Sequence, residues 1–302
     1  MIVKRKTRRE FLKSSFSFMA SACVSGVATA EASEESYVKD EAYAMFYDAT
    51  ACVGCKACVA ACKRVNGLPA KKADFDPDGK WDAPVDLDSK TRTIIKLYKE
   101  NNNIWSYIKH QCMHCAKPSC VSACPVGAMR QDETGIVHYN ENICIGCRYC
   151  QVACPFNIPK FEWEKAFPKI VKCDMCKFTN LEKKGEPACT EVCPVNAVVF
   201  GRRKNLLNEA KRRLKENPDK YINHIYGELE AGGTNVIYLA SVPFEKLGFP
   251  KLDNKSPAAF TEKIQHTVYK GFIAPIALYA TLCLIALRNR RKNEQHDDKE
   301  EK

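Results

Sequence analysis

The residues best suited to chemistry in this chain are its cysteines, because their spacing is regular. One stretch reads Cys144-Ile-Gly-Cys147-Arg-Tyr-Cys150-Gln-Val-Ala-Cys154-Pro155. In such a compact run, one short loop directs three thiolates at a single cube of iron and sulfide, while the fourth thiolate points toward a neighbouring cluster. A zinc site would use ligands in two spaced pairs, which fits this run poorly. The stretch therefore predicts iron–sulfur ligation.

Three further runs repeat the pattern with variations in spacing. Their cysteines are Cys52, Cys55, Cys58 and Cys62 in the first run, Cys112, Cys115, Cys120 and Cys124 in the second, and Cys173, Cys176, Cys189 and Cys193 in the fourth. Proline follows the second and fourth runs, whereas lysine follows the first. The four runs (52–62, 112–124, 144–154 and 173–193) form an internal repeat and account for sixteen of the eighteen cysteines.

Sixteen thiols suit four 4Fe-4S clusters with four thiolates each, which leaves no open iron for substrate chemistry. Alone, Cys173 and Cys176 are compatible with half a zinc ribbon, but the closing Cys-Pro pair and the companion runs favour iron–sulfur. His114 lies between two cysteines of the second run. Because that run already has its thiols, we expect His114 to be a bystander rather than a ligand.

The segments between and after the runs predict an α+β fold. We expect an insertion over the cluster core at 64–111 with a strand at Thr91–Tyr98, and a pair of strands between Met129 and Tyr139. A surface loop is expected at Lys183–Gly185. Further expected elements are an amphipathic helix at 203–216 and a strand at Asn235–Ala240. The basic residues of that helix are expected to form a solvated face: Lys211, Arg212, Arg213 and Lys215.

The N-terminal residues 1–30 resemble an export signal. Arg8 and Arg9 form a twin arginine, a weakly apolar segment follows, and Ala28-Thr29-Ala30 is typical of a cleavage site. Export with an even cysteine count would normally suggest disulfides. The twin-arginine route carries folded proteins, however, so clusters can be inserted beforehand in the cytosol. If the signal is cleaved, Cys23 is lost with it. The alternative is that residues 1–30 are a basic N-terminus of a cytosolic protein.

Near the C-terminus, Gly271–Leu287 is a run of seventeen uncharged, mainly apolar residues. As a helix it would reach about 25 Å, just enough to span a membrane. We expect Pro275 in its first turn, Cys283 as an apolar filler, and a disordered charged tail at 293–302. Arginines after the run place that tail in the cytoplasm. The alternatives are a helix buried against a soluble partner or one lying on the membrane.

Composition and motifs point to electron transfer rather than catalysis. The net charge is +11, of which residues 1–13 contribute +5, and no nucleic-acid motif is present. No Ser-His-Asp set, paired-carboxylate signature or nucleotide-binding glycine loop stands out. The residues therefore predict a non-catalytic electron wire. A structural zinc or disulfide protein and a self-contained enzyme are the alternatives from other classes.

The whole chain resembles the ferredoxin-like iron–sulfur subunit of membrane-bound NiFe hydrogenases of the hydrogenase-2 type. The leader, the four runs and the C-terminal apolar segment carry the resemblance, in particular Cys52-Val-Gly-Cys55-Lys-Ala-Cys58, Gln111-Cys112-Met-His-Cys115, Thr134-Gly-Ile-Val-His-Tyr139, Ile143-Cys-Ile-Gly-Cys-Arg-Tyr-Cys150 and Ile264-Gln-His-Thr-Val-Tyr-Lys-Gly271. The cysteine runs are shared with a wider superfamily that includes formate dehydrogenase and dimethyl sulfoxide reductase electron-transfer subunits.

The resemblance implies how the thiols pair across the runs. The implied sets are Cys52, Cys55, Cys58 and Cys193; Cys62, Cys173, Cys176 and Cys189; Cys112, Cys115, Cys120 and Cys154; and Cys124, Cys144, Cys147 and Cys150. The implied fold is a tandem of bacterial ferredoxin-like domains that bind four 4Fe-4S clusters, with inserted loops and one C-terminal transmembrane helix. Spacing alone indicates only that each fourth cysteine leaves its own run.

The resemblance also implies partners and a location. The partners are the small and large subunits of a NiFe hydrogenase and an integral membrane subunit that reacts with quinone, so that hydrogen oxidation is coupled to quinone reduction. The place is the periplasmic side of the bacterial inner membrane. The runner-up partner is a molybdopterin oxidoreductase, such as formate dehydrogenase or polysulfide reductase.

The expected organisation has five parts. They are a signal peptide (1–30), a four-cluster region (43–201), a helix and strand extension (202–265), a transmembrane anchor (268–288) and a charged cytoplasmic tail (289–302).

Overall fold

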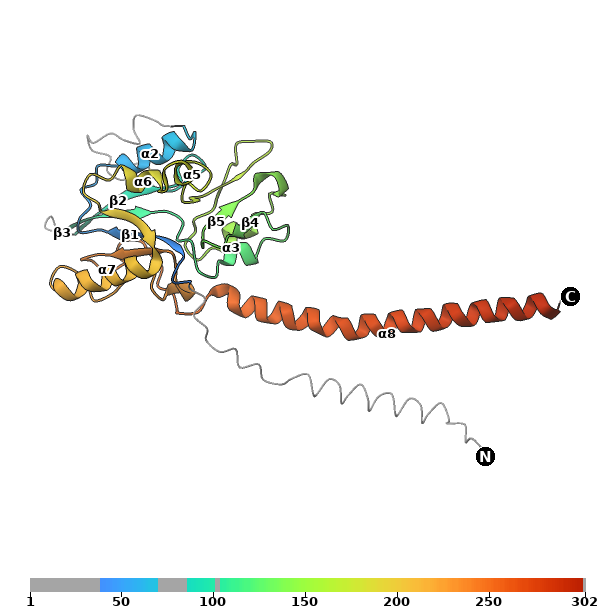
Figure 1. Cartoon of the computed structure of the whole chain (residues 1–302). Helices are drawn as coiled ribbons and strands as arrows, with labels where there is room; N and C mark the ends of the chain where they lie inside the picture. Colours follow the sequence, from blue (N-terminus) through green and yellow to red (C-terminus); the bar gives the residue numbers. More distant parts are fainter. Residues whose placement is uncertain (1–38, 70–85, 101–103, 301–302) are drawn as a thin grey trace. The chain divides into compact units, whose positions relative to one another are not determined.

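Short helices and small sheets alternate along the chain. The computed structural model describes residues 39–69, 86–100 and 104–300 (Figure 1). The predicted signal segment at 1–30, including its twin arginine and Cys23, lies outside the described residues. The mixture of helices and strands in the described part agrees with the predicted α+β character.

A three-stranded sheet in the order β8–β1–β9 connects distant parts of the chain. Its middle strand, β1 (Tyr43–Asp48), is antiparallel to β8 (Val198–Arg202) and parallel to β9 (Val236–Leu239). The predicted strand at Asn235–Ala240 is confirmed as β9. The sheet therefore joins the start of the first cysteine run, the end of the fourth run and the region after it.

The two faces of β1 pack against different layers, because neighbouring side chains on a strand point in opposite directions. Ala44 and Phe46 pack in one apolar cluster with α7 (Arg203–Glu216). Met45 and Tyr47 pack in another cluster, which contains cysteines of the first and fourth runs. Figure 1 shows α7 on one side of β1 and two cysteine-bearing helices, α2 (Ala57–Val65) and α6 (Ala188–Glu191), on the other.

Four short helices carry cysteines and pack in two pairs. In the first pair, α2 (Ala57–Val65) packs against α6 (Ala188–Glu191). In the second pair, α3 (Ser119–Ser122) packs against α4 (Tyr149–Val152). Each pair combines helices from two different cysteine runs.

Three hairpins complete the cysteine-rich region. β2 (Ile94–Glu100) pairs with β3 (Ile104–His110), and β6 (Lys160–Phe161) pairs with β7 (Ile170–Val171). β4 (Met129–Gln131) pairs with β5 (Val137–Tyr139), which confirms the predicted pair of strands after the second run. The shorter helical elements are η2 (Glu141–Ile143), α5 (Asn180–Lys184) and η3 (Glu230–Gly232).

Two local expectations were close but incomplete. The strand expected at Thr91–Tyr98 forms as β2, shifted to Ile94–Glu100. The surface loop expected at Lys183–Gly185 is instead the end of α5, closed by Gly185 in the left-handed region at φ 80°. A glycine after two lysines is a common helix C-terminal signal, because it satisfies the last carbonyl groups in a left-handed turn.

The helix expected at 203–216 is confirmed as α7, but its basic residues are not all solvated. The Arg213 guanidinium donates to the Asp48 carboxylate over 2.9 Å, and Asp48 is only 1% exposed. Arg212 pairs with Glu209 and Glu216 on the surface of the same helix. The expectation of a fully solvated basic face was therefore wrong for Arg213, because the helix crosses β1 directly above a buried carboxylate.

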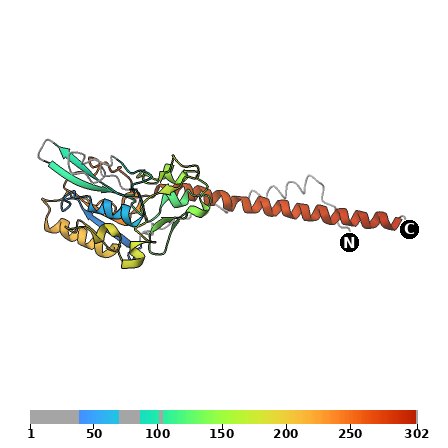
Figure 2. The same ribbon diagram turned by 90° about the horizontal axis from the view of Figure 1, so that it is seen from above.

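The C-terminal helix is longer than the sequence indicated. α8 runs from Pro257 to Glu300 as one uninterrupted helix (Figures 1 and 2). Pro275 lies inside it rather than in the first turn, so that expectation was wrong: the helix begins fourteen residues before the apolar run. The charged residues from 293 to 300 are also helical, not disordered. They are mainly Glu, Lys, Gln, Asp and Asn without Gly or Pro, so nothing in their sequence ends the helix.

Within α8, Gly271–Arg290 is long and apolar enough to cross a membrane, with a mean hydropathy of 1.8. It is the one such helix among the described residues, and none of this stretch is buried. The first turns of α8 contact the cysteine-rich region, since Lys117 pairs with Glu262 at 2.7 Å and Ala258 is buried.

The buried carboxylate of Asp48 leads to a first prediction. Burial raises its pKa, but hydrogen bonds from Thr50, Tyr221 and Arg213 outweigh burial and leave the pKa below its ordinary value. We expect Asp48→Asn to lower the free energy of unfolding by about 1.5–3 kcal/mol, because Arg213 loses its charged acceptor. The stabilisation by Asp48 is present above the unfolded-state pKa of about 3.9 and disappears as the pH falls through the lower folded-state pKa.

Denaturant unfolding at neutral and acid pH tests this prediction. The difference between the original protein and Asp48→Asn should be large at neutral pH and shrink in acid. Glu216→Gln is the matched control, because its partner Arg212 belongs to an exposed ion pair and little change is expected. Similar losses in the two variants would contradict the role of burial at Asp48.

Candidate iron–sulfur cluster sites

One group of thiols lines an apolar hollow beside the central sheet. Its members are Cys52, Cys55, Cys58 and Cys193 (the Cys52 group). The pairing of Tyr47 with Val198 brings them together, because Cys52 follows Tyr47 by five residues and Cys193 precedes Val198 by five. The last cysteine of the fourth run therefore lies with the first three of the first run.

A second group repeats this arrangement at the β4–β5 hairpin. Its members are Cys124, Cys144, Cys147 and Cys150 (the Cys124 group), and they line a hollow of their own. Here Met129 pairs with Tyr139. Cys124 precedes Met129 by five residues and Cys144 follows Tyr139 by five. These offsets equal those of Cys193 and Cys52 from the Val198–Tyr47 pair, so strand pairing brings the cysteine loops together in the same way in both groups.

A third group is buried between helices. Its members are Cys62, Cys173, Cys176 and Cys189 (the Cys62 group), and all of them are buried. The packing of α2 on α6 brings Cys62 close to Cys189. Burial raises the pKa of the Cys173 thiol well above its usual range, and the neighbouring thiolates of Cys62, Cys176 and Cys189 raise it further.

The fourth group joins the second run to the end of the third. Its members are Cys112, Cys115, Cys120 and Cys154 (the Cys112 group). Burial raises the pKa of the Cys115 thiol well above its usual range, and the thiolates of Cys112, Cys154 and Cys120 add to the rise. All sixteen thiols of the four runs thus fall into four groups of neighbours, and Cys283 in α8 belongs to none of them.

The four groups follow one another in space. Cys189 lies close enough to Cys58 to add to the rise that burial causes in the pKa of its thiol, and this pair connects the Cys52 and Cys62 groups. Cys173 and Cys112 share another and connect the Cys62 and Cys112 groups. Cys120 and Cys150 share a third and connect the Cys112 and Cys124 groups. The Cys52 group, with exposed Cys55, and the Cys124 group, with three half-buried members, form the two ends of this row.

Backbone N–H groups point at several sulfur atoms. Gly54 donates to Cys52 Sγ, Gly146 to Cys144 Sγ and Met175 to Cys173 Sγ, each over 3.4 Å. Ala128 donates to Cys124 Sγ over 3.1 Å and Ala197 to Cys193 Sγ over 3.2 Å. Such donors stabilise negative charge on sulfur and tune cluster potentials.

The donor set fits an iron–sulfur cluster. Burial raises the pKa of Cys58 and of Cys120 to about 12 in each case, so these thiols hold their protons at neutral pH unless a metal replaces them. Iron binding would remove the protons and place thiolates in hollows that already contain N–H donors. Each group supplies four sulfur ligands, the number that one 4Fe-4S cluster requires.

Other polar side chains near the thiols were not predicted as functional. Lys172 and Lys109 are buried, at 4% and 1% exposure, and so is Tyr238. Lys172 directly precedes a cysteine and follows the apolar pair Ile170–Val171, a sequence context that could have indicated a buried position. His114, expected to be a bystander, is fully buried, and its Nδ1 accepts a hydrogen bond from the Val137 N–H over 3.0 Å.

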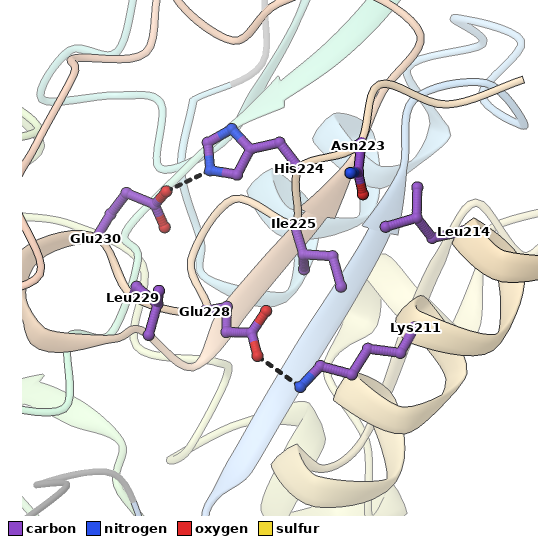
Figure 3. A pocket seen from close by; sticks show the side chains of 8 residues that line it. All are labelled: Lys211, Leu214, Asn223, His224, Ile225, Glu228, Leu229 and Glu230. Carbon is purple, nitrogen blue, oxygen red and sulfur yellow. Dashed lines mark hydrogen bonds and ion pairs between the residues drawn. The ribbon is translucent and has the colours of Figure 1, made fainter. Parts of the chain in front are cut away.

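A further hollow lies away from the thiols, between α7 and residues 223–230 (Figure 3). Its polar side chains face each other in pairs: Lys211 with Glu228 and His224 with Glu230, each at 2.6 Å. Because these side chains already have partners in one another, they do not form an evident binding site for an ion.

Comparison with known proteins identifies one family model and several similar proteins. The family model of a 4Fe-4S dicluster domain matches residues 103–203. The chain is 43% identical over 288 residues to the hydrogenase-2 operon protein HybA of Escherichia coli O157:H7, a match that covers 84% of this chain and 86% of that protein. It is 34% identical over 243 residues to the iron–sulfur subunit of the nitrate-inducible formate dehydrogenase of Escherichia coli K12, covering 78% and 79% respectively. The formate dehydrogenase iron–sulfur subunit of Haemophilus influenzae is also 34% identical, over 245 residues, covering 78% and 75%.

The two equivalent glycines of the cysteine loops give a second prediction. Gly54 and Gly146 both have φ 70°, where a side chain is strained. A Cβ on Gly54 would lie 2.4 Å from Tyr107 Cε1, whereas one on Gly146 would lie 3.8 Å from Phe161. We expect Gly146→Ala to cost about 1–2 kcal/mol of stability from backbone strain alone. Gly54→Ala should cost about 1–3 kcal/mol more, because the Tyr107 ring must move.

Thermal unfolding and iron content per chain, measured on both variants, test the comparison. Gly54→Ala should melt at a lower temperature and retain less iron than Gly146→Ala. Equal losses would mean that the Tyr107 contact does not constrain the loop.

Proposed function

The chain belongs to the family of the hydrogenase-2 operon protein HybA, and we propose that it relays electrons through four 4Fe-4S clusters within a hydrogenase complex. In this proposal one end of the relay meets the small and large subunits of a periplasmic NiFe hydrogenase. The other end meets an integral membrane subunit that reacts with quinone. The chain thus serves hydrogen oxidation coupled to quinone reduction and is itself not catalytic.

The observation that carries the proposal is the row of thiol groups with two ends at the surface. The inner Cys62 group is wholly buried, whereas Cys55 in one end group is exposed. A 4Fe-4S cluster supplies reversible one-electron transfer. Clusters in such a row would be shielded from solvent in the middle and open to partners at both ends, as an electron relay requires.

We assign each group as the ligand set of one cluster. The Cys52, Cys62, Cys112 and Cys124 groups have the membership given above, and the proximity of the four thiols within each group supports the assignment. With every iron held by a cysteine, no coordination position remains for substrate. The ligand chemistry therefore favours electron transfer over catalysis.

The surface around the Cys124 group supports contact with a partner protein. Ile145, Tyr149 and Val152 belong to the third run and are 64%, 61% and 85% exposed. Large apolar side chains that gather on a surface often mark a protein interface. Contact there would bring a partner close to one end of the row.

We propose the periplasmic face of the inner membrane as the place of action. The twin arginine of residues 1–30 would direct export. The length and composition of Gly271–Arg290 support an anchor, and the basic residues after it support a cytoplasmic C-terminus. In this proposal the four-cluster region is 43–201, the helix and strand extension is 202–265, the anchor is 268–288 and the cytoplasmic tail is 289–302. The extension contributes β9 to the central sheet.

A molybdopterin oxidoreductase remains the second candidate partner. It is favoured by the formate dehydrogenase relatives, which have 34% identity over 78% of this chain. The HybA relative, with 43% identity over 84% of the chain, favours hydrogenase more strongly.

Metal analysis of the complex purified through this chain separates the candidates. We expect nickel together with about sixteen irons contributed by each copy of this chain, four for each cluster. Molybdenum or tungsten in place of nickel would mean that the partner is a molybdopterin oxidoreductase. Zinc without iron would overturn the assignment of the cysteines.

Cys147→Ser tests the ligand assignment directly. We expect the loss of the cluster in the Cys124 group, with about four fewer irons per chain and one fewer electron paramagnetic resonance (EPR) signal after reduction. The control is Cys283→Ser, because Cys283 is exposed in α8 and belongs to none of the groups. A full iron content in Cys147→Ser would contradict the assignment.

A further inference from the structure

Lys172 lies at the junction between the two inner thiol groups. It is 4% exposed and directly precedes Cys173 of the Cys62 group. Its Nζ donates to the carbonyl of Cys173 over 2.8 Å and approaches Cys112 Sγ of the Cys112 group at 3.9 Å. One side chain therefore contacts a member of each inner group.

The contacts of Lys172 suit a charged ammonium. A third contact joins Nζ to the Val137 carbonyl over 2.5 Å. An ammonium has three N–H donors and no acceptor, and here it meets three acceptors. A neutral amine would have only two N–H donors for the same three positions.

The positive charge lacks a carboxylate partner in the described part of the chain. Lys90, Lys160 and Lys177 pair with Asp or Glu, but no ion pair of Lys172 is found in that part. An unpaired buried charge is strongly destabilising unless other charges offset it. The nearest sources of negative charge are the thiolates: Lys172 counteracts the rise that burial causes in the pKa of Cys120.

Two more donors near this junction have no acceptor among residues 39–69, 86–100 and 104–300. The Tyr238 hydroxyl is buried without a hydrogen-bond partner in this part of the chain, and the thiolates that affect it belong to Cys173, Cys112 and Cys189. His114 accepts at Nδ1, so in its neutral form Nε2 carries the proton, and that atom is also buried without a partner. Unsatisfied buried donors beside thiol groups indicate that negative charge belongs there.

We propose that Lys172 is an electrostatic positioning residue that raises the reduction potential of the cluster in the Cys112 group. This inference rests on the proposed function, because it takes the Cys112 group as a ligand set. Reduction of a cluster adds one negative charge, and a fixed ammonium in a low-dielectric interior stabilises that charge. Lys172 thereby keeps an inner member of the relay from becoming a barrier to electron transfer.

Lys109 provides a comparison in another part of the row. It is 1% exposed and donates to Thr93 and Gln111. Burial lowers the pKa of its ammonium, but the thiolates of Cys189, Cys58, Cys173 and Cys62 outweigh burial and raise it. Its charge therefore acts on the Cys52 and Cys62 groups, whereas that of Lys172 acts on the Cys112 group.

An EPR-monitored redox titration of the purified complex tests the role of Lys172. In Lys172→Met, the midpoint potential of one cluster should shift to a more negative value, while the remaining midpoints stay near their original values. Lys172→Gln removes the charge but keeps two N–H donors, so it should give the same shift with less disturbance of packing. Lys172→Arg keeps the charge and should restore the midpoint toward the original value.

Lys177→Met is the matched control, because Lys177 is also a lysine near the β4–β5 hairpin but pairs with Asp132 at 2.5 Å. We expect no midpoint shift from it. Lys109→Met should shift a different cluster from the one that Lys172→Met shifts.

Iron content and the number of reducible signals are measured on every sample, which separates two kinds of failure. Fewer than four clusters in the unsubstituted complex would overturn the proposed function and this inference with it. Four clusters with unchanged midpoints in Lys172→Met and Lys172→Gln would overturn the role of Lys172 alone. Loss of a cluster in both neutral variants would make Lys172 a structural residue and would also overturn the inference.

Discussion

The burial of cysteine thiols is the constraint on which the rest of the structure depends. In the described part of the chain, the Cys62 group is buried throughout, and burial raises the pKa of Cys58 and Cys120 to about 12. A thiol in such surroundings does not ionise at neutral pH unless a metal takes the place of its proton. Metal binding and the folding of this region are therefore energetically coupled, as in other small metal-binding domains.

The structure buries its thiols in two halves that have the same local arrangement of strands and helices. In each half, two paired antiparallel strands bring together the cysteine loop that precedes one strand and the cysteine loop that follows the other. The strands are β8 and β1 in one half, where Val198 pairs with Tyr47, and β4 and β5 in the other half, where Met129 pairs with Tyr139. Each half also packs two short helices that carry cysteines. The halves differ at Cys62, where lysine replaces the closing proline and α2 continues to Val65 instead of ending in a turn. Repetition of one plan explains why four runs of differing spacing give four similar groups.

The arrangement also separates the roles of the inner and outer groups. The outer groups have members at the surface, where partner proteins can approach, and exposed apolar side chains surround the Cys124 group. The inner groups lie in a drier interior, where fixed charges act strongly because the dielectric screening is weak. Lys109 and Lys172 are both found there, held by hydrogen bonds to neighbouring polar groups. In this interior, a single buried lysine has more influence on cluster chemistry than the many exposed lysines of the chain.

The sequence by itself determined the cysteine chemistry, the α+β character, α7, β9 and the hairpin after the second run, because these depend on local spacing and periodicity. It did not determine that Arg213 binds a buried carboxylate, since that contact joins residues 165 positions apart. Nor did it determine the full length of α8 or the burial of Lys172, because neither the start of a continuous helix nor the environment of a single lysine follows from hydrophobic periodicity. Apart from the sets that the resemblance implied, only the tertiary structure decided which thiols are neighbours and in what order their groups lie. That order depends on strand pairing and helix packing between distant runs, which the spacing within each run does not encode.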